Sequence, residues 1–329
     1  MPEQDMLFRE AIAEAMREEM HSDESVFLIG EDVGASGGIF KCCEGLFEEF
    51  GPNRVIDAPI AEAGYIGLSV GAAMTSMRPI AELMFGDFAL LAMDQIVNQA
   101  AKIRYMTGGQ CKVPLTIRLS MGAGRSSAAQ HSQSLQAIFS HIPGLKIAIP
   151  STPRDAKGLL KTAIRDNNPV LFFEDKMMYN DRGPVPDEAD FIIPFGQAEI
   201  KKIGSDVTLV ATSSMVSLSM QAAEKLQDEL SLSAEVVDPR TLVPLDEETI
   251  LASVQKTGYA IVIDEAPKGY GATAEIAARI GELAFDYLDA PVMRIGAADL
   301  PIPFSPPLEL PTIPDVDSIV NTVRKQRGL

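Results

Sequence analysis

The sequence alternates short, continuous apolar runs with stretches of helical periodicity along its whole length. This alternation limits the possible folds more than any single motif does. Runs such as Val26–Asp32 (VFLIGED), Leu145–Ser151 (LKIAIPS) and Pro169–Asp175 (PVLFFED) have the length of strands. They are apolar at successive positions, which is typical of strands buried on both faces. With helical segments between them, these strands predict an α/β fold, in which helices cover both faces of a mostly parallel sheet.

The alternation is interrupted at Tyr179–Phe195, a segment rich in proline, aspartate and glycine. A second series of strand and helix patterns follows, from Asp206–Ser214 to a last helix near Asp315–Arg327. A chain of 329 residues is also longer than one ordinary core requires. We therefore predict two α/β domains in tandem, at residues 1–180 and 197–329, joined by a linker at residues 181–196.

The charge balance limits the partners of the chain. It carries 28 basic and 46 acidic residues, a net charge of −18. This argues against nucleic acid or an anionic membrane as a partner, and no apolar run approaches the roughly 18 residues of a membrane span. The negative charge is compatible with docking on a basic partner. It is equally compatible with an acidic surface that is exposed to solvent and binds no partner. The amino terminus does not resemble a signal sequence, and the three cysteines form no CxxC pair, so we expect a cytoplasmic protein.

Several common cofactor motifs are absent from the sequence. No dinucleotide fingerprint G-x-G-x-x-G follows a strand, and neither the phosphate loop G-x-x-x-x-G-K-[ST] nor the zinc motif H-E-x-x-H occurs. Three histidines are too few to favour a polyhistidine metal site. These motifs alone would leave a two-domain α/β protein of open function.

A resemblance that runs in order through nearly the whole chain is more specific than any short motif. It is carried by GEDVGASGGIFK (30–41), GLFEEFGPNRVIDAPIAEAGYIGLSVGAA (45–73), RPIAELMFGDF (78–88), DQIVNQAAKIRYMTGGQ (94–110), AQHSQS (129–134), HIPGLKIAIPSTPRDAKGLL (141–160), AIRDNNPV (163–170), EVVDPRTLVPLD (235–246) and SVQKTGYAIVIDEA (253–266). Together these segments resemble the β subunits of the thiamine-diphosphate-dependent component of pyruvate, branched-chain 2-oxo acid and acetoin dehydrogenase complexes, within the transketolase-like superfamily.

The resemblance implies a domain that binds the pyrimidine ring of thiamine diphosphate, followed by a domain like the transketolase C-terminal domain. It implies an oxidoreductase of acetoin or pyruvate type, which cleaves acetoin or decarboxylates a 2-oxo acid and passes the acyl group to the lipoyl group of an acyltransferase. In this family an α subunit holds the diphosphate and magnesium through a GDG…N motif, which this sequence lacks. The expected assembly is therefore an α₂β₂ heterotetramer. A branched-chain 2-oxo acid dehydrogenase β subunit and a non-catalytic scaffold subunit of the same fold are the alternatives.

Site residues follow from the resemblance one by one. Glu62 matches the glutamate that contacts the aminopyrimidine, although a glutamate in the first turn of a helix also complements the helix dipole. Phe88 matches an aromatic residue that stacks on the pyrimidine, with Ile60 and Met84 as apolar neighbours; packing in the core is the alternative for all three. His131 matches a histidine that assists acyl transfer, and imidazole titrates in a suitable pH range. A surface histidine without a catalytic role is the alternative.

Some members of the family hold a potassium ion with backbone and side-chain oxygens. Oxygen ligands of this kind suit a hard cation. The alternative is ordinary capping of a helix, with a turn before Pro169. The matching positions here are Leu115, Ala163, Asp166 and Asn168.

Overall fold

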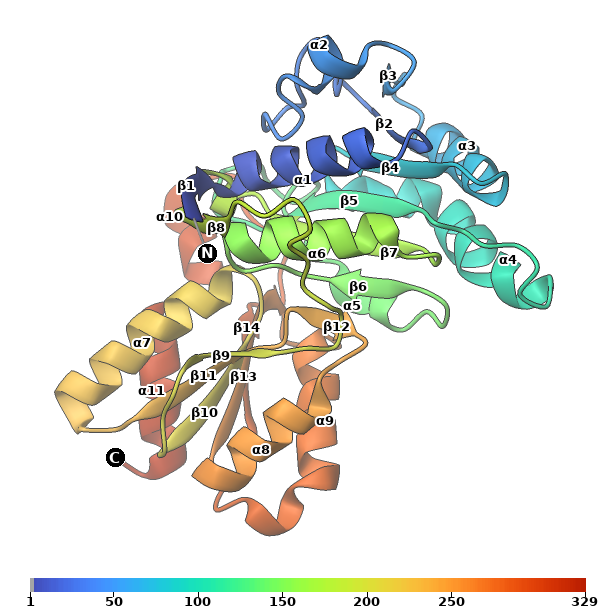
Figure 1. Cartoon of the computed structure of the whole chain (residues 1–329). Helices are drawn as coiled ribbons and strands as arrows, with labels where there is room; N and C mark the ends of the chain where they lie inside the picture. The colour runs from blue at the N-terminus through green and yellow to red at the C-terminus, as the bar shows by residue number, and fades with distance from the viewer. Residues whose placement is uncertain (1–2) are drawn as a thin grey trace. The chain divides into compact units, whose positions relative to one another are not determined.

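The computed structural model describes residues 3–329, and its contacts divide the chain into two compact units. The first unit contains Met1–Met121 and Ile138–Phe195, and the second contains Gly122–Ala137 and Gly196–Leu329. Each unit has a sheet of its own with helices around it (Figure 1). The segment Gly122–Ala137 lies inside the first predicted domain in the sequence but groups with the second unit by its contacts. The domain boundaries drawn from the sequence stay a prediction.

The first unit is built on parallel strands, as predicted. Neighbouring strands occur in the order β6, β7, β5, β4, β2, β3, and each pair is parallel. All residues of β2, β5 and β7 are buried, which explains why their sequences are apolar at successive positions. The bounds are β2 (Val26–Gly30), β3 (Val55–Asp57), β4 (Arg78–Leu83), β5 (Thr116–Met121), β6 (Lys146–Ala148) and β7 (Val170–Asp175).

The helices of this unit follow the predicted alternation. They are α1 (Phe8–Ser22), α2 (Leu46–Phe50), α3 (Glu62–Met74), α4 (Ala101–Met106) and α6 (Pro153–Arg165). A 3₁₀ turn, η1 (Gly86–Ala92), follows β4, and a π-helical stretch, η2 (Asp94–Ala100), leads into α4. The short α5 (Gln136–Ser140) starts where the chain returns from the second unit to the first. The predicted α/β fold class is therefore confirmed.

The predicted linker contains a strand. β8 (Arg182–Pro186) pairs antiparallel with β1 (Glu3–Leu7), which places the two segments side by side (Figure 1). Further along, Ile193 is buried and its N–H donates to the carbonyl of Gly158 on α6 at 3.1 Å. The segment up to Phe195 therefore packs on the first unit.

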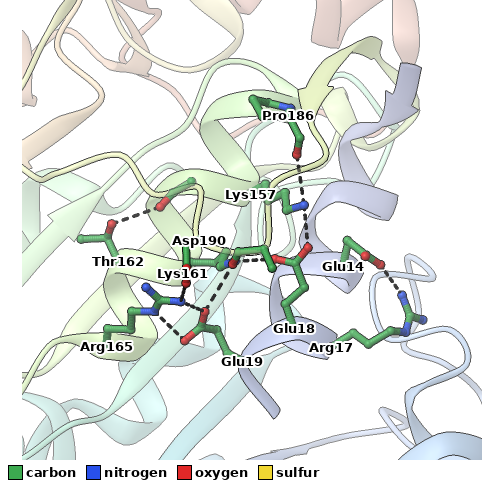
Figure 2. Close-up of polar contacts among 12 residues, drawn as sticks. Glu14, Arg17, Glu18, Glu19, Lys157, Lys161, Thr162, Arg165, Pro186 and Asp190 are labelled. Carbon is green, nitrogen blue, oxygen red and sulfur yellow. Dashed lines mark hydrogen bonds and ion pairs between the residues drawn. The ribbon is translucent and has the colours of Figure 1, made fainter. Parts of the chain in front are cut away.

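Helices α1 and α6 are joined by a buried ion cluster, shown in Figure 2. The side chains of Lys157 and Lys161 are 2% and 0% exposed, and both contact the Glu18 carboxylate. Lys161 also donates to the carbonyl of Ala189. At the end of α6, Arg165 makes a two-pronged contact with Glu19 at 2.8 and 2.9 Å. Every buried ammonium group here has an oxygen partner, as burial of a charge requires.

The second unit holds a five-stranded sheet in the order β14, β13, β10, β11, β9, in which only β9 is antiparallel to its neighbour. Its strands are β9 (Glu199–Lys202), β10 (Val207–Ala211), β11 (Ala234–Asp238), β13 (Ala260–Pro267) and β14 (Met293–Ala297), with a short β12 (Thr241–Val243). Its helices are α7 (Ser214–Leu230), α8 (Glu247–Thr257), α9 (Ala272–Leu283), α10 (Pro306–Glu309) and α11 (Val316–Arg327). Across residues 3–329, no helix is both long and apolar enough to cross a membrane.

Removal of one buried ammonium group should destabilise the first unit. In Lys161→Met, the donor to Glu18 and to the Ala189 carbonyl is lost, and we expect a cost of about 3–5 kcal/mol in the free energy of unfolding. Thermal unfolding would measure this as a lower Tm. Lys225→Met is the control, because Lys225 contacts Glu229 and Asp317 at the surface. Equal Tm values for the two variants would contradict a structural role for the cluster.

Candidate functional site

Glu62 lies at the carboxyl edge of the first sheet. It is the first residue of α3, just after the short connection that follows β3. The helix start explains its position, because a carboxylate complements the exposed N–H groups and the positive end of the helix dipole. Glu62 is 5% exposed, whereas Ile60 in the preceding connection is 85% exposed. The carboxyl edge is where ligands bind in open parallel sheets.

A second buried carboxyl group, Glu31, accompanies Glu62. Glu31 follows β2, which pairs in parallel with β3, so the two glutamates come from the same edge of neighbouring strands. Burial raises the pKa of Glu31, and the nearby charges of Glu62 and Asp32 raise it further. Within the described residues, the Oε1 atom of Glu31 has no hydrogen-bond partner. A buried polar atom without a partner in the chain is a place where a ligand can supply one.

Tyr65, one turn after Glu62 on α3, completes this group. Its hydroxyl hydrogen-bonds the Glu31 carboxyl group and also lies 3.3 Å from the carbonyl oxygen of Glu82. Burial raises the pKa of Tyr65, and the surrounding glutamates raise it further, so the phenol stays neutral. Neither Glu31 nor Tyr65 is among the site residues predicted from the sequence. The signal for Glu31 was its position directly after a buried strand.

Met84 and Phe88 follow β4, the next strand of the same sheet. The carbonyl of Met84 accepts a hydrogen bond from the Ser120 hydroxyl at 2.6 Å, which fixes this strand end to β5. Phe88 is partly buried within η1, and its ring meets that of Phe85 edge-on at 6.1 Å. Because η1 packs against α3, the structure brings Met84 and Phe88 to the sheet edge that carries Glu62.

His131 belongs to the second unit, in the segment 122–137, and is partly buried there. Its backbone N–H donates to the carbonyl of Ala128 at 3.3 Å. The adjacent residues Ser132–Leu135 line a cavity of about 350 Å³, together with Glu265, Pro267, Ala297 and residues 299–302. Glu62 and His131 thus belong to different units.

The predicted potassium ligands lie together in the first unit, where α6 ends and β5 begins. The carbonyl of Ala163 accepts from the N–H of Asp166 at 3.2 Å, and that of Leu115 accepts from Val170 at 2.9 Å. Each carbonyl oxygen has a second lone pair, so this donor set fits a hard cation chemically. The Asp166 carboxylate also accepts from the N–H of Asn168 at 2.8 Å, which is the turn expected as the alternative. Across residues 3–329, no group of three or more histidine, cysteine, aspartate or glutamate residues could hold a metal ion.

One sequence fragment, GLSVG at residues 67–71, has the letters of the nucleophile elbow found in hydrolases. It lies inside α3 rather than at a turn from strand to helix. Ser69 is 0% exposed, and its hydroxyl donates to the carbonyl of Tyr65 at 2.7 Å. Ser69 is therefore a buried residue of an ordinary helix rather than a nucleophile on a turn.

Comparison with known protein families now identifies the architecture. Residues 4–182 match the transketolase pyrimidine binding domain, and residues 196–319 match the transketolase C-terminal domain. The acetoin:2,6-dichlorophenolindophenol oxidoreductase subunit beta of Bacillus subtilis (strain 168) is 50% identical, over 97% of this chain and 96% of that protein. The chain belongs to the family of thiamine-dependent dehydrogenase β subunits.

Other members of this family are similar over the same length. The pyruvate dehydrogenase E1 component subunit beta of Rhizobium meliloti (strain 1021) is 45% identical, over 97% of this chain and 69% of that protein. The 2-oxoisovalerate dehydrogenase subunit beta of Bacillus subtilis is also 45% identical, over 97% of this chain and 98% of that protein. A solved split-gene transketolase, described as an inactive β4 tetramer, has the same fold, with a TM-score of 0.80 and 23% identity over 98% of this chain and 99% of that chain. The resemblance to this family of β subunits is confirmed.

The raised pKa of Glu31 gives a pH-dependent prediction for the chain without cofactor. The folded chain binds the Glu31 proton more tightly than the unfolded chain, so the stability from this group is full below the ordinary pKa of 4.5 and is lost as the pH rises through the raised value. Glu31→Gln removes this loss. We expect the difference between the Tm of the variant and the Tm of wild type to be more positive at pH 7.5 than at pH 4.5. The change in this difference should be about 2 °C or more.

The matched control is Glu224→Gln, which changes an exposed glutamate on α7. Its Tm relative to wild type should differ little between the two pH values. A Glu31→Gln effect of the same size at pH 4.5 and pH 7.5 would contradict the assignment of a raised pKa.

Proposed function

We propose that this chain is the β subunit of a thiamine-diphosphate-dependent dehydrogenase component of acetoin or pyruvate type. It cleaves acetoin or decarboxylates a 2-oxo acid and passes the acyl group to the lipoyl group of an acyltransferase. The observation that carries the proposal is the buried pair Glu62 and Glu31 at the carboxyl edge of a sheet that matches the pyrimidine binding domain. The family membership supplies the reaction class.

The residues at this edge fit the cofactor that the family implies. Bound thiamine diphosphate would supply an electron sink that stabilises the carbanion left when the substrate's carbon–carbon bond next to its carbonyl group breaks. In our proposal the Glu62 carboxyl group shares a proton with a ring nitrogen of the aminopyrimidine. The unpartnered Oε1 of Glu31 supports this fit, because a buried carboxyl oxygen needs a donor that the described chain does not provide. Phe88 would offer a ring face to the pyrimidine, with Met84 and the exposed Ile60 as apolar contacts.

The remaining parts of the active site are proposed to come from a separate α subunit. That subunit would hold the diphosphate group and magnesium, because this chain has no GDG…N motif. An α₂β₂ heterotetramer and a lipoyl-bearing acyltransferase are the proposed partners, and the net charge of −18 is compatible with basic partner surfaces. We also propose potassium at the carbonyl oxygens near Leu115 and Ala163, and a cytoplasmic location.

Among the possible substrates, acetoin is placed first because the relative named for acetoin is 50% identical, against 44–47% for the relatives named for pyruvate and 45% for the relative named for 2-oxoisovalerate. A branched-chain 2-oxo acid dehydrogenase β subunit remains the second candidate. A non-catalytic scaffold is the third, and the intact Glu62, Phe88 and His131 argue against it.

The decisive experiment uses this chain co-expressed with its α partner. We expect reduction of a dye acceptor that depends on thiamine diphosphate, with acetoin, pyruvate and branched 2-oxo acids tested in parallel. Glu62→Gln removes the shared proton and should lower kcat by about 100-fold or more, whereas Glu224→Gln should leave it unchanged. A stable αβ assembly that turns over none of these substrates would favour the scaffold.

A second experiment separates the role of His131 from that of Glu62. His131→Ala should lower acyl transfer to a lipoylated domain by about 100-fold, because the transfer needs a positioned proton donor. Dye reduction does not involve the lipoyl group and should fall less. Equal losses in the two assays would contradict a role of His131 in acyl transfer.

A further inference from the structure

The loop that carries His131 has an unusual backbone. Gly122 and Gly124 both have φ values of 96°, and the non-glycine residues Ser126 and Ala128 have φ values of 56° and 60°. Side chains disfavour this left-handed region, so such residues persist only where the surroundings hold them in place. The segment just before His131 therefore needs contacts that fix its conformation.

One carboxylate provides two of these contacts. Glu309, the last residue of α10, accepts hydrogen bonds from the N–H groups of Gly124 at 2.7 Å and of Ser126 at 2.8 Å, one at each oxygen. Glu309 is 0% exposed, and its own carbonyl accepts from the Thr312 hydroxyl at 2.6 Å. All these residues belong to the second unit. A buried carboxylate whose bonds go to backbone N–H groups fixes the path of the loop rather than that of another side chain.

Two neighbouring carboxylates hold the loop on either side of these bonds. Glu265 accepts from the N–H of Ala123, and Asp264 accepts from the Gln136 amide at 2.9 and 3.0 Å. His131 lies between the two anchored ends. The backbone N–H of His131 donates to the carbonyl of Ala128, which has a left-handed backbone conformation and lies two positions after Ser126. The backbone at His131 is therefore tied to the segment whose N–H groups Glu309 holds.

We propose that Glu309 is a positioning residue that holds the loop so that His131 is presented in its working orientation. This proposal rests on the role proposed for His131 above. This geometry calls for a carboxylate, because each of the two N–H groups bonds a different oxygen of the side chain. A glutamine would offer one oxygen and turn an NH₂ group toward the other N–H.

The direct test is hydrogen exchange at the amides of Gly124 and Ser126 in the αβ complex. Glu309→Gln should speed exchange at one or both amides by about tenfold or more, because a hydrogen bond to a charged group is lost. Glu224→Gln is the matched control on an exposed helix and should leave both rates unchanged. Unchanged exchange in Glu309→Gln would overturn the proposal. If Glu309→Gln does not fold, Glu309→Asp is the second variant. It keeps the charged group, but its side chain is shorter by one methylene, so the hydrogen-exchange rates of the same two amides should rise.

The functional test is a double-mutant cycle with His131→Ala, read as acyl transfer to a lipoylated domain. Glu309→Gln should lower this rate by about tenfold in the wild-type background and by less than about twofold in the His131→Ala background, because the two changes affect one group. Equal losses in both backgrounds would show that Glu309 acts on the fold in general, and would overturn the proposal.

The cycle also separates this proposal from the one on which it rests. If His131→Ala alone leaves acyl transfer intact, the role proposed for His131 fails, whatever Glu309→Gln does. If His131→Ala lowers the rate while Glu309→Gln changes neither the rate nor the amide exchange, only the role of Glu309 fails.

Discussion

The first unit depends on one buried guanidinium group. Arg118 on β5 contacts Glu82 on β4 at 2.5 Å and makes two bonds to Glu174 on β7 at 2.7 and 2.8 Å, so it connects three adjacent strands. Arg118 is 1% exposed. Loss of one partner from such a network leaves an uncompensated buried charge, at a cost of about 3–5 kcal/mol. Burial raises the pKa of Glu174 while the guanidinium lowers it, and the Tyr179 hydroxyl donates to the same carboxylate at 2.9 Å.

This network extends to the candidate site through Glu82. Its side chain bonds Arg118 and accepts from the Cys43 thiol at 3.1 Å, while its backbone carbonyl lies 3.3 Å from the Tyr65 hydroxyl. Tyr65 in turn contacts Glu31, the buried carboxyl group beside Glu62. The hydrogen bonds of this network therefore restrict the movement of the polar groups at the sheet edge. Such rigidity suits a site that must hold a ring and a proton in a defined geometry.

In our proposal, the catalytic groups of the chain are divided between its two units. The first unit supplies a carboxyl pair and apolar side chains at a sheet edge, and the second supplies an imidazole on a loop held by carboxylates. Neither unit contains a motif for a diphosphate group. A chain with these parts and without a diphosphate motif fits our proposal that a partner subunit completes the active site. The relatives are each named as a subunit beta.

The sequence by itself determined the parallel sheet and the family, and it led to the prediction that Glu62 is a site residue. Burial on both faces makes a strand apolar at every position, so runs such as Val26–Asp32 can be recognised locally. Glu62 was predicted because it lies in a long, ordered match to the family rather than because of its local pattern. The tertiary structure alone showed that Glu31 and Tyr65 accompany it, that β8 pairs with β1, and that Glu309 reaches Gly124, 185 residues earlier in the chain. Hydrogen bonds between such distant segments leave no periodic signal, because they depend on where the fold brings single residues together.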